Sequence, residues 1–141
     1  MRLFMCLIAV FIALALPLRA ESLSPADEAA FRDVIADQIA AFEADDTARA
    51  YSHAAPLIRQ NFPDADRFMG MVRQSYLPVY RPQSYNFGKA GFSASGRPIQ
   101  RVTIVGSDGR TYEAIYTMER QPDGTWQING CALVRSPDIS A

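Results

Sequence analysis

The sequence has few of the residues that build disulfides, metal sites and nucleic-acid contacts. It has two cysteines, one histidine and 14 basic residues against 15 acidic ones, with no block of basic residues. Phosphate binding needs clustered cations, so nucleic acid is not an expected partner. No His/Cys cluster, Gly-rich phosphate loop or hydrolase serine motif is present, so neither a metal nor a cofactor is expected.

The one long hydrophobic run lies at the N-terminus and is typical of a secretory signal peptide. Arg2 supplies the positive charge, residues 3–16 are almost all apolar, and a cleavage site is expected before Glu21. The run is short for a membrane span, which needs about 20 residues, and an uncleaved anchor is the alternative. We therefore expect a periplasmic or secreted protein, free of the membrane once residues 1–20 are removed. Residues 21–141 are expected to form a single domain with its core at about 24–135.

After removal of residues 1–20, Cys131 is the one cysteine that remains. The remaining chain has 12 basic residues and 15 acidic ones. No intramolecular disulfide is then possible, so stability must come from the core. A catalytic thiol needs a nearby cation or histidine, and none is indicated for Cys131. A buried, inert cysteine is expected, with a redox-sensitive thiol or an intermolecular contact as alternatives.

The first half of the domain has helical patterns. Ser24, Pro25 and Asp27 form a capping box with proline at the first helical position. An apolar stripe follows at helical spacing: Phe31, Val34, Ile35, Gln38, Ile39 and Phe42. The aspartates at 45–46 and 64–66 stand where helices should begin, and helix capping explains them better than a cation site. Pro78 and Pro82 are expected to end the helical half.

The sequence pattern of the second half predicts four strands, at residues 85–92, 99–105, 111–119 and 126–134. An Asp108-Gly109 turn of two residues would place Val105 opposite Tyr112 and Arg101 opposite Tyr116. A three-residue turn at 122–124 would place Met118 opposite Ile128. This register assigns nine residues to the face that meets the helices: Val105, Tyr112, Ala114, Tyr116, Met118, Trp126, Ile128, Ala132 and Val134. The opposite face would carry Val102, Ile104, Ile115, Cys131 and Leu133.

That opposite face is expected to be an apolar patch that a second copy of the chain covers. The predicted homodimer contact consists of Val102, Ile104, Ile115 and Leu133.

Three residues are candidates for catalysis or ligand binding, each with a structural alternative. Arg101 is predicted on the helix-facing side, where a guanidinium needs an anionic partner. The alternatives are that Arg101 extends to water at the sheet end, or that a bulge turns it outward. His53 could act as a general base but has no neighbouring acid in sequence, which favours a surface or structural role. Tyr116 could polarise a carbonyl group.

Aromatic residues are unusually frequent and could line an apolar pocket with a few hydroxyl donors. The predicted pocket comprises Tyr51, Tyr76, Tyr80, Arg101, Tyr116 and Trp126. The alternative is that these aromatic side chains belong to the ordinary core.

Helices followed by an antiparallel meander with a tryptophan in its last strand resemble the cone-shaped fold of the nuclear transport factor 2-like superfamily. Residues 31–134 also resemble an uncharacterised bacterial family, domain of unknown function 4864. The resemblance lies in residues 39–46, 71–82 and 116–126. It implies an exported α+β domain with N-terminal helices packed on a curved antiparallel sheet of about four strands. It implies no established activity.

The sequence thus predicts an exported module that binds a small amphipathic or anionic molecule, or that serves as an interaction scaffold. The alternative is an isomerase-like or dehydratase-like enzyme that uses the space between helices and sheet. The enzyme requires an ionisable side chain and a second polar group that face each other in that space, and the binding module or scaffold does not.

Overall fold

The computed structural model describes residues 22–137, which form five helices and one four-stranded antiparallel sheet. The helices are α1 (Pro25–Glu43), α2 (Thr47–Ser52), α3 (Pro56–Asn61), α4 (Ala65–Ser75) and α5 (Leu77–Tyr80). The strands, adjacent in chain order, are β1 (Pro82–Phe92), β2 (Pro98–Gly106), β3 (Thr111–Arg120) and β4 (Trp126–Arg135). The predicted α+β class and the four antiparallel strands are confirmed. The predicted signal peptide lies outside the described residues.

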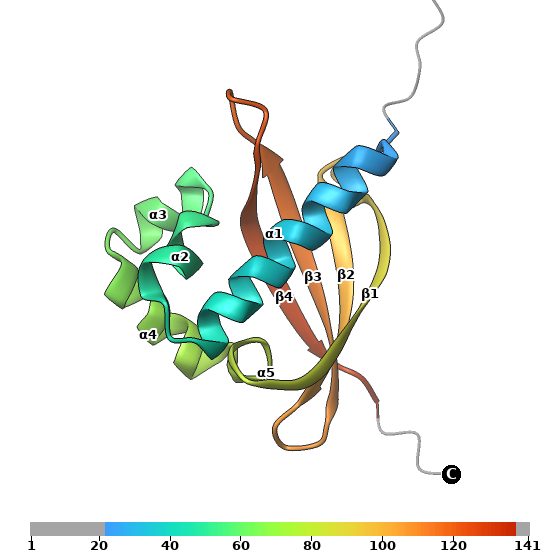
Figure 1. The fold of residues 1–141 in the computed structure, drawn as a ribbon. Coiled ribbons are helices and arrows are strands. Elements are labelled where there is room, and N and C mark those ends of the chain that lie inside the picture. The colour runs from blue at the N-terminus through green and yellow to red at the C-terminus, as the bar shows by residue number, and fades with distance from the viewer. Residues whose placement is uncertain (1–21, 138–141) are drawn as a thin grey trace, which may run out of the picture.

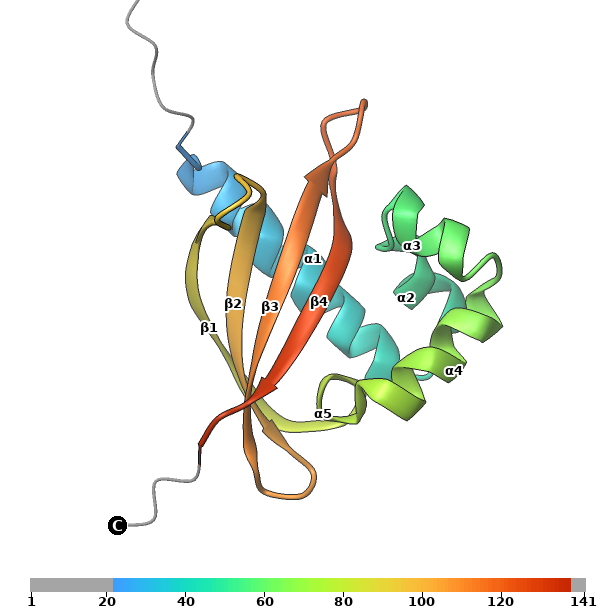
Figure 2. The same ribbon diagram turned by 180° about the vertical axis from the view of Figure 1, so that it is seen from behind.

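Helix α1 crosses one face of the sheet, α2, α3 and α4 form a lobe beside strand β4, and α5 leads from this lobe into β1 (Figure 1). The opposite face of the sheet carries no helix (Figure 2). No helix within residues 22–137 is both long and apolar enough to cross a membrane.

The helix starts follow the local signals in the sequence. The predicted capping box is present, because Asp27 N–H donates to Ser24 Oγ and Ser24 N–H donates to the Asp27 carboxylate. Asp46 and Asp64 cap α2 and α4 through their side chains, as expected. Pro78 does not end the helical half, because it lies at the first turn of α5, where its missing N–H costs no hydrogen bond.

The core lies between α1 and the inner face of the sheet. Phe31 and Ile35 from α1 are fully buried, and so are Val102 and Ile104 from β2. The Phe31 ring meets Trp126 edge to face, with ring centroids 4.7 Å apart, which fixes the N-terminal half of α1 against β4.

The predicted pairing of β2 with β3 is wrong by one residue. Val105 lies opposite Thr111, not Tyr112, because the hairpin loop has three residues. Gly109 supplies the left-handed backbone at φ 78°, and Gly106 N–H donates to Arg110 O across the base of the loop. A Cβ at Gly106 would lie 2.8 Å from Asp108 Oδ1, so glycine is needed where the loop folds back.

The pairing of β3 with β4 begins as predicted and then shifts. Met118 lies opposite Ile128, but Thr117 lies opposite Gly130, which leaves Asn129 as the extra residue of a bulge. Beyond the bulge Cys131 pairs with Tyr116, whereas the register set by the turn at 122–124 alone would pair Gly130 with Tyr116. A one-residue shift reverses the faces of a strand. Cys131 and Leu133 therefore face the helices, and Ala132 and Val134 do not.

The residues of the predicted dimer face are consequently not on one face. Val102 and Ile104 are 0 % exposed and belong to the core, and Leu133 packs against it from the same side. Ile115 pairs with Arg101 on the outer side of the sheet. The homodimer stays a prediction, but three of the four residues that motivated it point inward.

Candidate functional site

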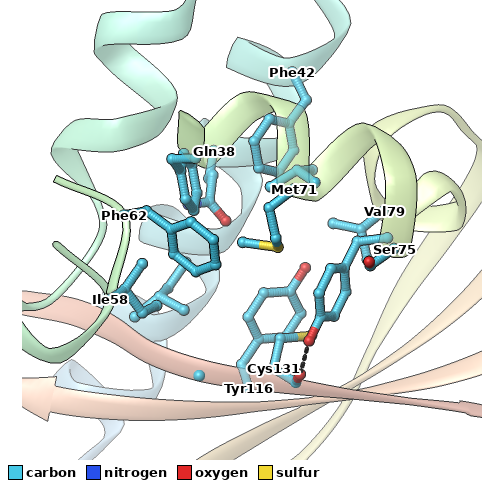
Figure 3. Close-up of a pocket in the computed structure, with 14 residues that line it drawn as sticks. Gln38, Phe42, Ile58, Phe62, Met71, Ser75, Val79, Tyr116 and Cys131 are labelled. Carbon is cyan, nitrogen blue, oxygen red and sulfur yellow. Dashed lines mark hydrogen bonds between the residues drawn. The ribbon is translucent and has the colours of Figure 1, made fainter. Parts of the chain in front are cut away.

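A cavity of about 370 Å³ lies between the helical lobe and the inner face of the sheet. Strands β3 and β4 form its floor, α1 and α3 form two walls, and α4 and α5 close it from above (Figure 3). Fourteen residues line it: Gln38, Phe42, Ile58, Phe62, Phe68, Met71, Val72, Ser75, Tyr76, Val79, Tyr116, Ile128, Gly130 and Cys131.

The cavity persists because backbone hydrogen bonds hold the lobe at the edge of the sheet. Ala55 N–H donates to Ile128 O at 2.8 Å, and Ile128 N–H donates to His53 O at 2.8 Å. These two bonds attach the α2–α3 connection beside β4, next to the Asn129 bulge. The lobe therefore cannot close onto Tyr116 without breaking them.

Tyr116 is the most informative residue of the site. Its side chain rises from the middle of β3 toward Met71, which points at it from α4 (Figure 3). The residue is 1 % exposed, yet its hydroxyl has no hydrogen-bond partner among the described residues. Buried hydroxyls are almost always paired, because an unpaired one loses its hydration without compensation. The Tyr116 hydroxyl is thus a hydrogen-bonding group that the protein itself leaves unused.

Two further polar groups of the lining are held in place by bonds to the backbone. Tyr76 Oη donates to Cys131 O at 2.9 Å (dashed line in Figure 3). Gln38 Nε2 donates one proton to Ala50 O at 3.1 Å, which fixes the amide orientation and leaves Oε1 as an acceptor. The Gln38 side chain points into the cavity (Figure 3).

The cavity is electrically neutral. Its fourteen lining residues include no carboxylate, histidine, lysine or arginine. Burial raises the pKa of the Cys131 thiol to about 12 and raises the pKa of Tyr116 well above its ordinary value. Burial also raises the pKa of Tyr76. All three groups are therefore protonated at neutral pH, and none can serve there as a base.

Of the six residues predicted to line a pocket, Tyr76 and Tyr116 do so. Tyr51 packs on Phe68 and donates to Phe62 O at 2.6 Å, so it supports the wall from behind. Tyr80 is bonded to Asp45 and lies under the guanidinium of Arg81, 3.9 Å from its ring centroid.

Trp126 and Arg101 lie away from the cavity. Trp126 borders a separate, more open hollow near the β3–β4 turn. Arg101 is on the outer face because of the register shift, and its Nη1 bonds Glu113 Oε1 at 2.8 Å. The outward alternative for Arg101 is thus the observed one, and its cause is the three-residue loop rather than a bulge in β2.

His53 is outside the cavity as well. Its Nε2 lies 2.6 Å from Asp37 Oδ2, and Arg49 bonds the same carboxylate through two nitrogens. His53 has no acidic neighbour in sequence, but the fold supplies one, because Asp37 lies on α1 sixteen residues earlier in the chain. The hydrogen bonds from Arg49 and then His53 hold the pKa of Asp37 well below its usual range. This cluster joins α1 to α2.

Replacement of Asp37 with asparagine is expected to lower the free energy of unfolding at pH 7 by less than about 1 kcal/mol, because the ion pair is partly exposed. The stabilisation from a lowered pKa is complete above the unfolded value of about 3.9 and is lost as pH falls through the folded value. The wild-type and Asp37→Asn stabilities should therefore converge in strong acid. Urea unfolding at several pH values measures this, with Asp33→Asn on the same helix as the control. A difference that persists in strong acid would contradict the ion-pair origin.

Most of the residues that line the cavity carry no signal in the sequence that predicts this role. Gln38 was recognised only as a member of an apolar stripe, although a glutamine in such a stripe is a usable sign of a polar group facing inward. Cys131 was assigned to the outer face because the bulge was not foreseen. Ile58, Phe62 and Met71 carry no local signal that separates cavity lining from core. Within residues 22–137 no three histidine, cysteine or acidic side chains gather as a metal site would require.

Two tyrosine-to-phenylalanine changes should have opposite effects on stability. Tyr76→Phe removes the bond to Cys131 O and should cost about 1 kcal/mol. Tyr116→Phe removes an unpartnered hydroxyl and should leave stability unchanged or raise it by about 1 kcal/mol. Denaturant unfolding of both variants beside the wild type measures this. A loss in Tyr116→Phe as large as that in Tyr76→Phe would mean that the Tyr116 hydroxyl is already bonded in the unliganded protein.

The fold and the site together define the class of protein. It is an α+β domain with a neutral, mostly apolar cavity between a helical lobe and one face of an antiparallel sheet. The model of the family described as Domain of unknown function (DUF4864) matches residues 24–141, and the chain belongs to that family. A comparison with curated proteins finds no significant match.

Proposed function

We propose that this protein binds a small, largely apolar molecule in the cavity between its helices and its sheet. The observation that carries the proposal is the Tyr116 hydroxyl, which is buried at the cavity floor with no partner among residues 22–137. The cavity supplies the apolar surface for the body of a ligand, and small-molecule sites typically combine such surface with a few fixed polar groups. Cavities of about 150 Å³ hold benzene, so 370 Å³ has room for a larger ring system.

The enzyme alternative is less well supported by the geometry. An isomerase or dehydratase needs a group that exchanges protons near neutral pH. The ionisable groups that line the cavity are two tyrosines and a cysteine, all with raised pKa values. His53 and Arg101, the other two catalytic candidates, contact Asp37 and Glu113 elsewhere. Binding of an apolar ligand, in contrast, requires no group in the lining to exchange a proton near neutral pH.

Naphthalene is a suitable first probe, because it is apolar, uncharged and larger than benzene. A ligand that binds the folded state and not the unfolded one raises the melting temperature, and the rise grows with the logarithm of the ligand concentration above its dissociation constant. We expect a concentration-dependent rise with naphthalene in differential scanning fluorimetry and saturable binding in calorimetric titration, both with the full chain. No rise at the solubility limit, and no heat of binding, would contradict the proposal.

Export and the finer fold assignment are part of the same proposal. The pattern of residues 1–20 supports cleavage before or near Glu21 and a periplasmic or secreted location. Intact-mass measurement of the protein recovered from the periplasm of a bacterium producing the full chain tests this. A mass that still includes residues 1–20 would favour a retained anchor. The helices-then-meander order and the cavity between them support placement in the nuclear transport factor 2-like superfamily.

A further inference from the structure

The polar atoms of the cavity restrict the chemistry of its ligand, provided that the proposed binding function holds. The Tyr116 hydroxyl can donate a hydrogen bond to a ligand, because no described residue accepts one from it. A second hydrogen-bonding position is Gln38 Oε1, a carbonyl oxygen that accepts, while Nε2 gives one of its two protons to Ala50 O. The Tyr76 oxygen, whose proton is bonded to Cys131 O, can also accept.

Charge on the ligand is disfavoured by the same lining. An ion in this cavity would lose its hydration, and none of the fourteen lining residues carries a compensating charge. Arg101, which the sequence placed here as a partner for an anion, is bound to Glu113 on the far side of the sheet. An anionic ligand therefore finds no cation among the fourteen lining residues.

We propose that the cavity selects neutral alcohols or phenols with an apolar ring or chain body. The ligand hydroxyl accepts a hydrogen bond from Tyr116 Oη and donates its own proton to an acceptor of the lining, Gln38 Oε1 or Tyr76 Oη. The apolar body lies among Phe62, Met71 and the neighbouring side chains of α3 and α4. Tyr116 is then a specificity-determining residue, and its unpaired hydroxyl is kept for the ligand.

Three naphthalene derivatives of nearly equal size test this: naphthalene, 2-naphthol and 2-naphthoate at pH 7. Their dissociation constants are measured by calorimetric titration for wild type, Tyr116→Phe and Tyr112→Phe. The last variant is the control, because Tyr112 lies on the same strand but its hydroxyl bonds Asp108 at the hairpin, away from the cavity. The quantity compared is the ratio of naphthalene to 2-naphthol dissociation constants, which cancels the shared apolar contribution.

We expect this ratio to fall about three- to tenfold in Tyr116→Phe and to stay at the wild-type value in Tyr112→Phe. We expect 2-naphthoate to bind at least about tenfold more weakly than 2-naphthol. An unchanged ratio in Tyr116→Phe, or tightest binding by 2-naphthoate, would overturn the inference while leaving the binding function in place. Absence of binding by all three compounds would overturn the proposed function and this inference with it.

Discussion

Replacement of Ile104 with lysine is expected to unfold the domain or to lower its stability by more than about 4 kcal/mol. Ile104 is 0 % exposed and packs in the core between β2 and α1. The substitution removes a fully buried aliphatic side chain and places a charge where no partner is present. Such a loss is a large share of the 5–15 kcal/mol that typically separates folded from unfolded domains.

The neighbouring Thr103→Lys change is the matched control. Thr103 is exposed on the outer face and lies opposite Glu113 on β3, so a lysine there gains an oppositely charged cross-strand neighbour. We expect its stability to stay within about 1 kcal/mol of wild type, measured for both variants by urea unfolding followed by circular dichroism. The register predicted from a two-residue hairpin would reverse the outcome, since it places Thr103 inside and Ile104 outside.

Filling the cavity with a larger side chain is expected to weaken naphthalene binding by at least about tenfold. Met71 points into the cavity from α4 opposite Tyr116 (Figure 3), and tryptophan at this position would occupy the space that the ligand needs. Because the space already exists, Met71→Trp should cost little stability and should raise it where the indole packs well.

Met71→Leu is the control for this second prediction. It conserves volume and apolar character and should leave both stability and affinity near wild type. Calorimetric titration gives the affinities, and thermal unfolding verifies that each variant is folded. A folded Met71→Trp variant that binds naphthalene as tightly as wild type would place the bound molecule elsewhere.

Local signals predicted the parts of the fold that depend on a few adjacent residues. The capping box at Ser24, the caps at Asp46 and Asp64, and the pairing of Met118 with Ile128 all follow from neighbours within four residues along the chain or across one turn. In each case the stabilising contact lies within the same short segment as the sequence signal. The prediction therefore does not depend on how distant parts of the chain pack.

The predicted register of the β2–β3 hairpin is wrong because its sequence suits two loops. Asp-Gly fits a two-residue turn, and it equally fits a three-residue loop in which the glycine alone takes the left-handed conformation. The observed loop is the second, with Gly109 at φ 78°. Gly106 suits this loop as well, because a Cβ there would lie 2.8 Å from Asp108 Oδ1 and 3.1 Å from the Tyr112 ring. Because of this one-residue difference in register, Val102 and Ile104 lie in the core and not on the predicted surface patch.

The cavity depends on contacts that no local pattern encodes. The Asn129 bulge turns Cys131 inward, and it lies beside the backbone bonds that attach residues 53–55 to Ile128. Gln38 comes from α1 and Met71 from α4, and the two meet only because the lobe is fixed at the edge of β4. Tyr116 was chosen from the sequence for its place on the inner face, but the feature that makes it informative, an unpartnered hydroxyl, is visible only in the packed structure.

The binding claim can be tested most directly by NMR of methionine methyl groups labelled with carbon-13. Met71 lines the cavity, whereas Met118 lies at the other end of the inner face and borders the separate hollow near Trp126. On titration with 2-naphthol we predict a saturable shift of the Met71 methyl signal from the aromatic ring current, with little change at Met118. Assignment follows from Met71→Leu and Met118→Leu spectra. A shift confined to Met118, or none at either position, would contradict a ligand site between the helical lobe and the sheet.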